Sequence, residues 1–233
     1  MTDIAVTHAR LPGADGLTLA VDILGPSDGP PALLLHGMGQ TRHSWGQSAA
    51  ALAGRGWRVY MVDHRGHGDS DWPQAADYDH LHWARDIIAL CGELDSRPLV
   101  IGASLGGMCS LVAQREVAYP LFSGVVLVDI APDLDMDGGK RIMNFMNSNA
   151  GGFADLDEAA AVIGAYRGGE RKPSPSGLQR VLRQRDDGRW YWHWDPRILE
   201  GRVRWINDPE AAAQYGERIR SAMVAGGQQP LDH

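Results

Sequence analysis

The sequence is poor in the features that define several large classes of protein. Among its 233 residues are only two cysteines, Cys91 and Cys109, in no metal-type spacing, and we interpret them as thiols of a reducing compartment. No apolar run approaches the roughly 18 residues that a membrane span needs, and the polar N-terminus lacks the apolar region of a signal peptide. Because 22 basic residues face 29 acidic ones, the net charge is −7. These deficits argue against nucleic acid or membrane partners and predict a soluble, cytoplasmic protein.

Short apolar runs alternate with amphipathic helical patterns through the first half of the chain. The runs predict strands at Leu17–Leu24, Ala32–Leu35, Trp57–Val62, Pro98–Gly102 and Gly124–Ile130. Helices are predicted at Ser44–Ala53, at Leu105–Val117 and along the apolar stripe between Ala84 and Leu94. This alternation predicts an α/β fold with a mostly parallel central sheet flanked by helices on both faces.

The pattern changes after Pro132, where helical segments are separated by glycine and proline. Helices are predicted at Lys140–Asn147, Asp157–Tyr166, Gly177–Arg185 and Pro209–Met223, with an aromatic cluster at Trp190–Trp194. We therefore divide the chain into an α/β core at 1–132, an inserted helical cap at 133–207, and a terminal helix with its tail at 208–233.

The segment Gly102-Ala103-Ser104-Leu105-Gly106 has the form G-x-S-x-G, after a predicted strand and before a predicted helix. This context is typical of a nucleophile elbow, a sharp turn that presents a serine hydroxyl above the sheet. Small neighbours are needed because the strand and the helix pack closely around a strained serine backbone. The alternative is an ordinary glycine-rich turn. The sequence predicts that Ser104 is a catalytic nucleophile.

A second glycine-rich loop, His36-Gly37-Met38-Gly39, follows the predicted strand "PALLL". Acyl transfer needs two N–H donors for the oxyanion of its tetrahedral intermediate. The backbone N–H groups of Met38 and Leu105 are the candidates, and the alternative for this loop is a plain turn. We interpret His36 as a structural residue that bonds the backbone around the loop. A proton-transfer role for His36 is the secondary alternative.

The loop Asp63-His64-Arg65-Gly66-His67-Gly68-Asp69-Ser70 gathers two histidines and two aspartates. These side chains could bind a metal ion, but the glycines and the position after a strand favour a tight structural turn. We expect no metal ion and no cofactor.

Taken together, "LLLHGMGQTRHSWG", "VDHRGHGDSDW", "VIGASLGG" and "VVLVDIAP", in this order, resemble the α/β-hydrolase superfamily. The likeness is to its cap-bearing serine hydrolases: esterases, haloperoxidase-like enzymes and carbon–carbon bond hydrolases. It implies the α/β-hydrolase fold, Ser104 as nucleophile, and Met38 and Leu105 as oxyanion donors. Relatives that open epoxides or cleave carbon–halogen bonds carry aspartate at the elbow, so the serine favours acyl transfer to water.

The general base and its acid partner are the elements that the sequence does not supply. In the family order a serine is followed by an acid and then by a histidine, and here only His193 and His233 follow Ser104. In an extended segment His193 would share a face with Tyr191 and Asp195, but local packing is the preferred interpretation. Asp129 is a secondary candidate for the acid.

The resemblance therefore implies that about 50 to 60 residues, two strand–helix units, are missing from the C-terminal side of the fold plan. On this expectation Gly124–Ile130 forms an exposed sheet edge that promotes self-association.

We expect a hydrolase of an ester or related carbonyl substrate, carboxylesterase-like and weakly active as this chain. Three aromatic residues would line an apolar acyl or aryl pocket: Trp190, Trp192 and Trp194. The alternative is a non-catalytic or fragmentary member of the fold that at most binds a small apolar ligand. Esterase, perhydrolase, thioesterase and carbon–carbon hydrolase activities stay open, because they differ in pocket shape and not in motif.

Overall fold

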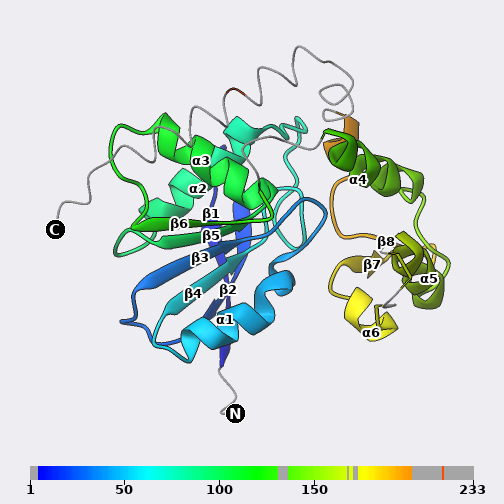
Figure 1. Ribbon diagram of the computed structural model, residues 1–233, viewed down its shortest axis with the longest axis horizontal. Helices are drawn as coiled ribbons and strands as arrows, with labels where there is room; N and C mark the ends of the chain where they lie inside the picture. Colours follow the sequence, from blue (N-terminus) through cyan, green and yellow to red (C-terminus); the bar gives the residue numbers. More distant parts are fainter. Residues whose placement is uncertain (1–4, 131–135, 167, 170–172, 201–216, 218–233) are drawn as a thin grey trace.

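The computed structural model describes residues 5–130, 136–166, 168–169, 173–200 and 217 (Figure 1). The predicted helix over 209–223, apart from the helical Glu217, lies outside the described residues, as do residues 201–207 and His233. No helix among the residues described here is long and apolar enough to cross a membrane.

A six-stranded sheet with the order β1-β2-β4-β3-β5-β6 forms the centre of the molecule. Its strands are β1 (Val6–Pro12), β2 (Thr18–Leu24), β3 (Pro31–Leu35), β4 (Arg58–Val62), β5 (Leu99–Ala103) and β6 (Gly124–Val128). Strand β2 is antiparallel to both of its neighbours, whereas β4, β3, β5 and β6 run parallel. The predicted mostly parallel sheet is confirmed.

Helices cover both faces of the parallel part of the sheet, and the side chains of β3 alternate between them. Leu33 and Leu35 pack in the core cluster that contains α2 (His80–Gly92) and α3 (Leu105–Glu116). Ala32 and Leu34 pack on the other face against α1 (Gly46–Ala53). Figure 1 shows α2 and α3 on one side of the sheet and α1 on the other. Burial on both faces explains the continuous apolar run "PALLL".

Strand β1 is absent from the sequence-based prediction. Its seven residues, "VTHARLP", are mostly exposed and carry polar side chains, because β1 lies at the edge of the sheet and pairs only with β2. The polarity of an edge strand hides it from a search for apolar runs.

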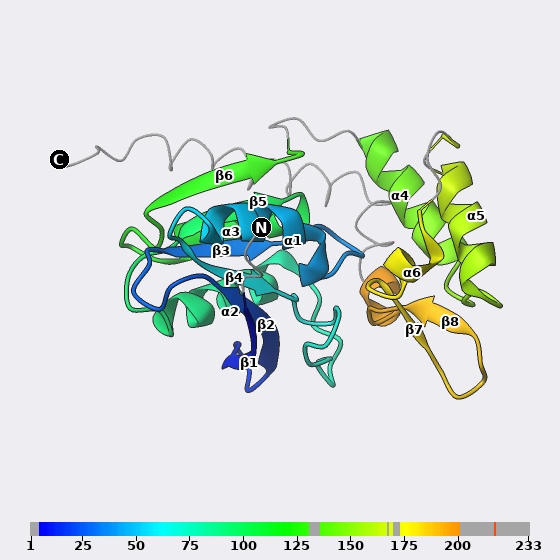
Figure 2. The same ribbon diagram turned by 90° about the horizontal axis from the view of Figure 1, so that it is seen from below.

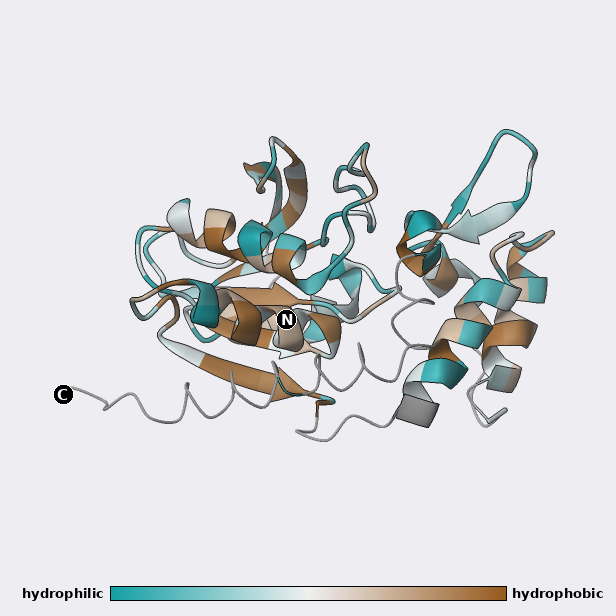
Figure 3. Cartoon of the chain, turned by 90° about the horizontal axis from the view of Figure 1, so that it is seen from above, coloured by the Kyte–Doolittle hydropathy of each residue, from teal (hydrophilic) through white to brown (hydrophobic). Residues whose placement is uncertain are grey.

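Strand β6 forms the other edge of the sheet within the described residues, as the sequence predicts. It is apolar throughout, and Val125, Val126 and Val128 are 38%, 44% and 38% exposed. Figure 3 shows it as a hydrophobic strand along the rim of the sheet.

A second group of elements lies beyond the carboxyl ends of the parallel strands (Figures 1 and 2). It comprises α4 (Met136–Ser148), α5 (Leu156–Tyr166), α6 (Pro175–Leu178), β7 (Leu182–Gln184) and β8 (Trp190–Trp192). The predicted helix Gly177–Arg185 is wrong: α6 ends at Leu178, and β7 pairs with β8 as an antiparallel hairpin. The turn at Gly188, with a φ of 78°, lets the chain reverse and bring Arg185 opposite Arg189.

Candidate active site

Ser104 occupies a sharp turn between β5 and α3. Its φ of 44° and ψ of −109° lie outside the regions that a serine ordinarily adopts. The Ser104 N–H donates to the Val128 carbonyl at 3.0 Å and so extends the ladder between β5 and β6. The side chain is half-buried at the carboxyl end of the strand. A strained serine between strand and helix is what the G-x-S-x-G pattern predicts.

Two glycines permit this turn because backbone crowds both of them. A Cβ on Gly102 would lie 2.5 Å from the Gly107 nitrogen, and one on Gly106 would lie 2.5 Å from the Leu35 carbonyl oxygen. Real Cβ atoms do not approach backbone so closely. The two glycines of the G-x-S-x-G pattern are therefore required because β3, β5 and α3 pack closely around the serine.

The loop after β3 reaches the same place. A Cβ on Gly37 would lie 3.6 Å from the Cβ of Ser104. Residues 37–40 form a turn in which the Gln40 N–H donates to the Gly37 carbonyl at 3.1 Å. Gly39 has a φ of 73°, as a turn with glycine at its third position requires. The structure thus brings the two loops that the sequence singles out side by side.

Hydrogen bonds within this turn leave one N–H group available. The Gly37 N–H donates to Oε1 of Gln40 at 3.1 Å, and the Gly39 N–H donates to Nε2 of His67 at 3.2 Å. Within the described residues, the Met38 N–H has no acceptor. Leu105 is the first residue of α3, so its N–H has no acceptor within the helix. Met38 and Leu105 are the N–H donors that the sequence predicts for an oxyanion.

His36 is fully buried and orders this loop. Its Nε2 accepts the His64 N–H at 3.1 Å, so its Nδ1 carries the proton and donates to the Gly37 carbonyl at 2.8 Å. Burial lowers the pKa of His36, and the Asp63 carboxylate only partly offsets that effect. Both nitrogens of this neutral imidazole are engaged by backbone, so His36 positions the loop and leaves no nitrogen open to a reacting group.

His64 and His67 complete a cluster of three buried imidazoles. Nε2 of His64 lies 3.1 Å from the His36 carbonyl, and Nδ1 of His67 lies 3.1 Å from the Arg65 carbonyl. Burial, and then the neighbouring His36 and His67, hold the pKa of His64 well below its usual value. The described part of the chain contains no group of three His, Cys, Asp or Glu side chains placed to hold a metal ion. The ring nitrogens named here bond backbone instead.

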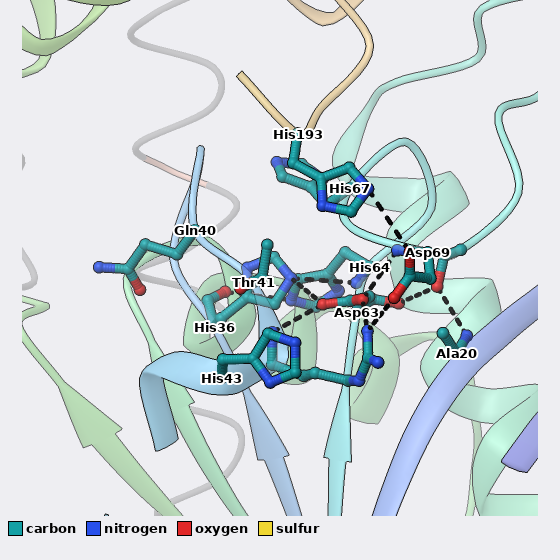
Figure 4. A network of polar contacts seen from close by, with 12 residues as sticks. Ala20, His36, Gln40, Thr41, His43, Asp63, His64, His67, Asp69 and His193 are labelled. Carbon is teal, nitrogen blue, oxygen red and sulfur yellow. Dashed lines mark hydrogen bonds and ion pairs between the residues drawn. The ribbon is translucent and has the colours of Figure 1, made fainter. Parts of the chain in front are cut away.

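A buried ion-pair network underlies these histidines (Figure 4). Asp63 follows β4 and accepts from both the backbone N–H and the guanidinium of Arg42. The guanidinium also contacts Asp22 of β2 at 3.1 Å and Asp69 at 3.0 Å. A Cβ on Gly68 would overlap the Asp63 carboxylate. These contacts fix the loop after β4 as the tight structural turn that its glycines predict.

Asp69 connects this network to the β7–β8 hairpin. One carboxylate oxygen lies 2.7 Å from Nη2 of Arg183 and 3.5 Å from Nε2 of His193. Burial by itself would raise the pKa of Asp69, but the hydrogen bond from Arg42, with the charges of His193, Arg42 and Arg183, lowers it. Burial and the Arg183 charge lower the pKa of His193. His193 therefore faces Asp69.

The His193–Asp195 pair suggested by alternation along the extended segment does not form. Asp195 accepts from Tyr78 at 2.5 Å and from Arg197 at 2.6 Å, while Tyr191 donates to Asp187 at 2.6 Å. Strand β8 ends at Trp192, so the alternation does not continue beyond it. Tyr191 and Asp195, the two residues expected to share a face with His193, thus bond other side chains and not its imidazole.

The three predicted pocket tryptophans have different surroundings. Trp190 packs in the cluster formed by α5, α6 and the hairpin. Trp192 stacks on Trp194 with ring centroids 6.5 Å apart. Trp194 is 2% exposed, and its Nε1 lies 3.8 Å from the position of a Cβ on Gly39. Of the three, Trp194 is the one that lies beside the candidate oxyanion loop, at Gly39.

Asp129 directly follows β6, with a φ of 57° and an exposed side chain. Because Ala103 pairs with Val128, Asp129 lies opposite Ser104 at the same edge of the sheet. Within the described residues, no histidine hydrogen-bonds to Ser104. The structure therefore brings together the nucleophile candidate, the two N–H donors and Asp129, and leaves His193 in a separate network around Asp69.

Sequence reasoning missed two contributors to the site, Gln40 and Arg42. Both lie within six residues of His36, in the segment "HGMGQTR". Their spacing from the oxyanion loop is the signal that could have identified them, although only the folded loop shows what each side chain bonds.

Comparisons with known proteins identify the family and the fold. A family model described as "Alpha/beta hydrolase family" matches residues 32–233. The protein phosphatase methylesterase 1 of Mus musculus is 30% identical over 138 residues, 57% of this chain and 36% of the methylesterase. The non-heme chloroperoxidase of Streptomyces lividans is 34% identical over 132 residues, 54% of this chain and 48% of the chloroperoxidase. The matches thus span about a third to a half of these curated relatives.

Among solved structures, E-2-(acetamidomethylene)succinate hydrolase is similar with a TM-score of 0.74 at 19% identity. The similarity covers 92% of this chain and 87% of that one. Together with the family model it shows that the chain has the alpha/beta hydrolase fold.

Proposed function

The chain belongs to the alpha/beta hydrolase family, and on this basis we propose that it hydrolyses an ester or related carbonyl compound with Ser104 as its nucleophile. The observation that carries the proposal is the strained backbone of Ser104, which puts its Cβ beside Gly37 and directly before the start of α3. A φ of 44° at a serine costs about 1–3 kcal/mol and persists where the surrounding structure enforces it. The methylesterase among the relatives adds support for an ester substrate.

The geometry suggests how each group acts. The Ser104 Oγ attacks the carbonyl carbon, and the N–H groups of Met38 and Leu105 hold the resulting oxyanion. The bond to the leaving oxygen then breaks, the leaving alcohol carries away the proton that the Ser104 hydroxyl lost, and an acyl group remains on Ser104. Attack by water on this acyl-enzyme releases the acid, and one proton of that water restores the serine hydroxyl.

We also propose that residues 133–207 form a cap over this site, with an apolar acyl or aryl group bound beneath it. Met146 of α4 and Trp194 approach Gly39, at 3.0 Å and 3.8 Å from the position of its missing Cβ. Apolar side chains next to the oxyanion loop favour a small apolar ester. The cysteine content fits a cytoplasmic site of action.

Turnover by this chain alone should be slow, because within the described residues no histidine hydrogen-bonds to Ser104. A serine hydrolase that lacks one triad member keeps about 10³–10⁴-fold catalysis over water from the oxyanion hole and binding. The sensitive measurement is therefore the covalent intermediate.

The test is to incubate the protein with p-nitrophenyl acetate and to examine its peptides by mass spectrometry. We expect an acetyl group on Ser104 and release of p-nitrophenol, both abolished in Ser104→Ala. Ser110→Ala is the matched control, since Ser110 lies on the same helix and bonds the Gly106 carbonyl. Equal p-nitrophenol release by the wild type and Ser104→Ala, with no adduct on Ser104, would contradict the proposal and support the non-catalytic alternative.

A further inference from the structure

Gln40 ends the oxyanion turn with its carboxamide in a defined orientation. Its Oε1 accepts the Gly37 N–H at 3.1 Å. Because an N–H can be accepted only by the oxygen, this bond distinguishes the two ends of the amide. The Nε2 group, with two N–H donors, is directed away from Gly37. Within the described residues, Nε2 has no acceptor, and Gln40 is exposed.

This carboxamide lies next to the proposed nucleophile. The position of a Cβ on Gly37 is 3.4 Å from Oε1 of Gln40 and 3.6 Å from the Cβ of Ser104. The two side chains therefore flank the same face of Gly37. Figure 4 shows Gln40 on the side of the network away from Asp63 and Asp69, with its amide nitrogen pointing away from the histidines.

We propose that the Nε2 group of Gln40 binds the substrate by donating a hydrogen bond to a second acceptor oxygen in the acyl group. This inference rests on the proposed function. The acyl group stays on Ser104 beside Gly37 through both chemical steps, whereas the leaving alcohol departs. Because the Gln40 carboxamide is held against Gly37, its Nε2 donor favours acyl chains with an ether, keto or carboxylate oxygen close to the scissile carbonyl.

The same side chain also orders the turn through Oε1, and two substitutions separate the two roles. Gln40→Glu keeps an acceptor for the Gly37 N–H and removes the N–H donors. Gln40→Met removes both at a similar size. If Gln40 only positions the turn, Gln40→Glu should keep the activity that Gln40→Met loses, and it should do so with every substrate. A substrate-binding role predicts that both variants lose the preference for the acceptor oxygen.

The kinetic test compares p-nitrophenyl methoxyacetate with p-nitrophenyl butanoate, which differ by one oxygen in place of a methylene. The ratio of their Ser104-dependent kcat/KM values should fall about three- to tenfold in both Gln40 variants, as loss of one net hydrogen bond predicts. The chemical reactivity of the two esters cancels between variants. Gln47→Glu, the same change at an exposed position on α1, should leave the ratio unchanged. An unchanged ratio in both Gln40 variants overturns the proposal.

A binding test separates this inference from the proposed function. In Ser104→Ala, labelled with ¹⁵N, methyl methoxyacetate should shift the side-chain amide resonances of Gln40 and methyl butanoate should not. If the wild type shows no Ser104-dependent turnover while this shift is present, the hydrolase proposal fails and the binding role stands. If neither ester shifts these resonances, or if both shift them equally, the binding role of Gln40 is wrong.

Discussion

Nε2 of His67 accepts the Gly39 N–H at 3.2 Å, and this contact joins the loop after β4 to the loop after β3. Nδ1 of the same ring lies 3.1 Å from the Arg65 carbonyl. Only the neutral tautomer with the proton on Nδ1 makes both bonds. The candidate oxyanion loop is thus held in place by a buried histidine of the loop after β4.

Replacement of His67 by phenylalanine should weaken both the fold and the site. The ring is fully buried, so the Gly39 N–H would lose its acceptor, and within the described residues the Arg65 carbonyl would keep only the Trp83 Nε1 donor at 3.3 Å. An unsatisfied buried group costs about 1–3 kcal/mol. We expect a loss of at least about 2 kcal/mol in urea unfolding and slower acetylation of Ser104. His8→Phe is the control, because it removes a 74% exposed imidazole that bonds the Asp22 carboxylate and no backbone group of the loop. Unchanged stability in His67→Phe would contradict the bridging role.

Stability should fall between about pH 7 and pH 5. Burial lowers the pKa of His36 and His64 in the folded state, whereas both return to about 6.5 on unfolding. Below that value the unfolded chain binds protons that the folded chain does not, so acid favours unfolding. Each histidine contributes a slope of up to about 1.4 kcal/mol per pH unit. Urea unfolding at pH 8, 6.5 and 5 measures it, and stability that is flat from pH 7 to 5 would show that these imidazoles titrate normally.

Gly68→Ala should be among the most destabilising single changes in the described core. Gly68 has a φ of 53°, and its Cβ would overlap the Asp63 carboxylate that binds Arg42. Gly16→Ala is a matched control, since Gly16 has a φ of 76° with no atom within 4 Å of its Cβ position. The control should lose about 1–2 kcal/mol from backbone strain, and Gly68→Ala at least about 2 kcal/mol more. Equal losses in thermal or urea unfolding would mean that the loop relaxes around the added methyl group.

Strand β6 should promote self-association. The strand carries exposed valines, and Val126 is 44% exposed. Within the described residues it pairs with another strand on one side only, which leaves an open edge. Light scattering during size-exclusion chromatography should show a mass that rises with concentration, and Val126→Lys should reduce the rise. Val6→Lys is the control, because Val6 is 43% exposed on β1, at the opposite edge. A monomer at every concentration would argue against association through this edge.

The local chemistry of the elbow could be predicted from the sequence because it depends on residues that are adjacent in the chain. Gly102, Ser104 and Gly106 belong to one turn, and their steric requirement is visible as the spacing of small residues around a serine. The buried strands were equally predictable, since burial on both faces leaves an apolar run such as Pro31–Leu35. The edge strand β1 was missed because an exposed edge needs no such run.

The helix predicted over Gly177–Arg185 failed because tertiary pairing outweighs a local pattern of this length. Leu182 lies opposite Trp192, and this pairing stabilises a hairpin that no window of neighbouring residues contains.

By itself, the sequence determined the α/β class, the position of Ser104 at the end of a buried strand, and the glycine-rich loop at Met38. Each depends on the period or spacing of consecutive side chains, which local physics links directly to backbone geometry. Only the tertiary structure decided that His193 faces Asp69 and not Asp195, and that Gln40 bonds the Gly37 N–H. His193 and Asp69 are distant in the chain, and the Gln40 bond needs a folded turn. Partners of this kind are chosen by the packing of whole elements, which leaves no regular pattern in the order of the residues.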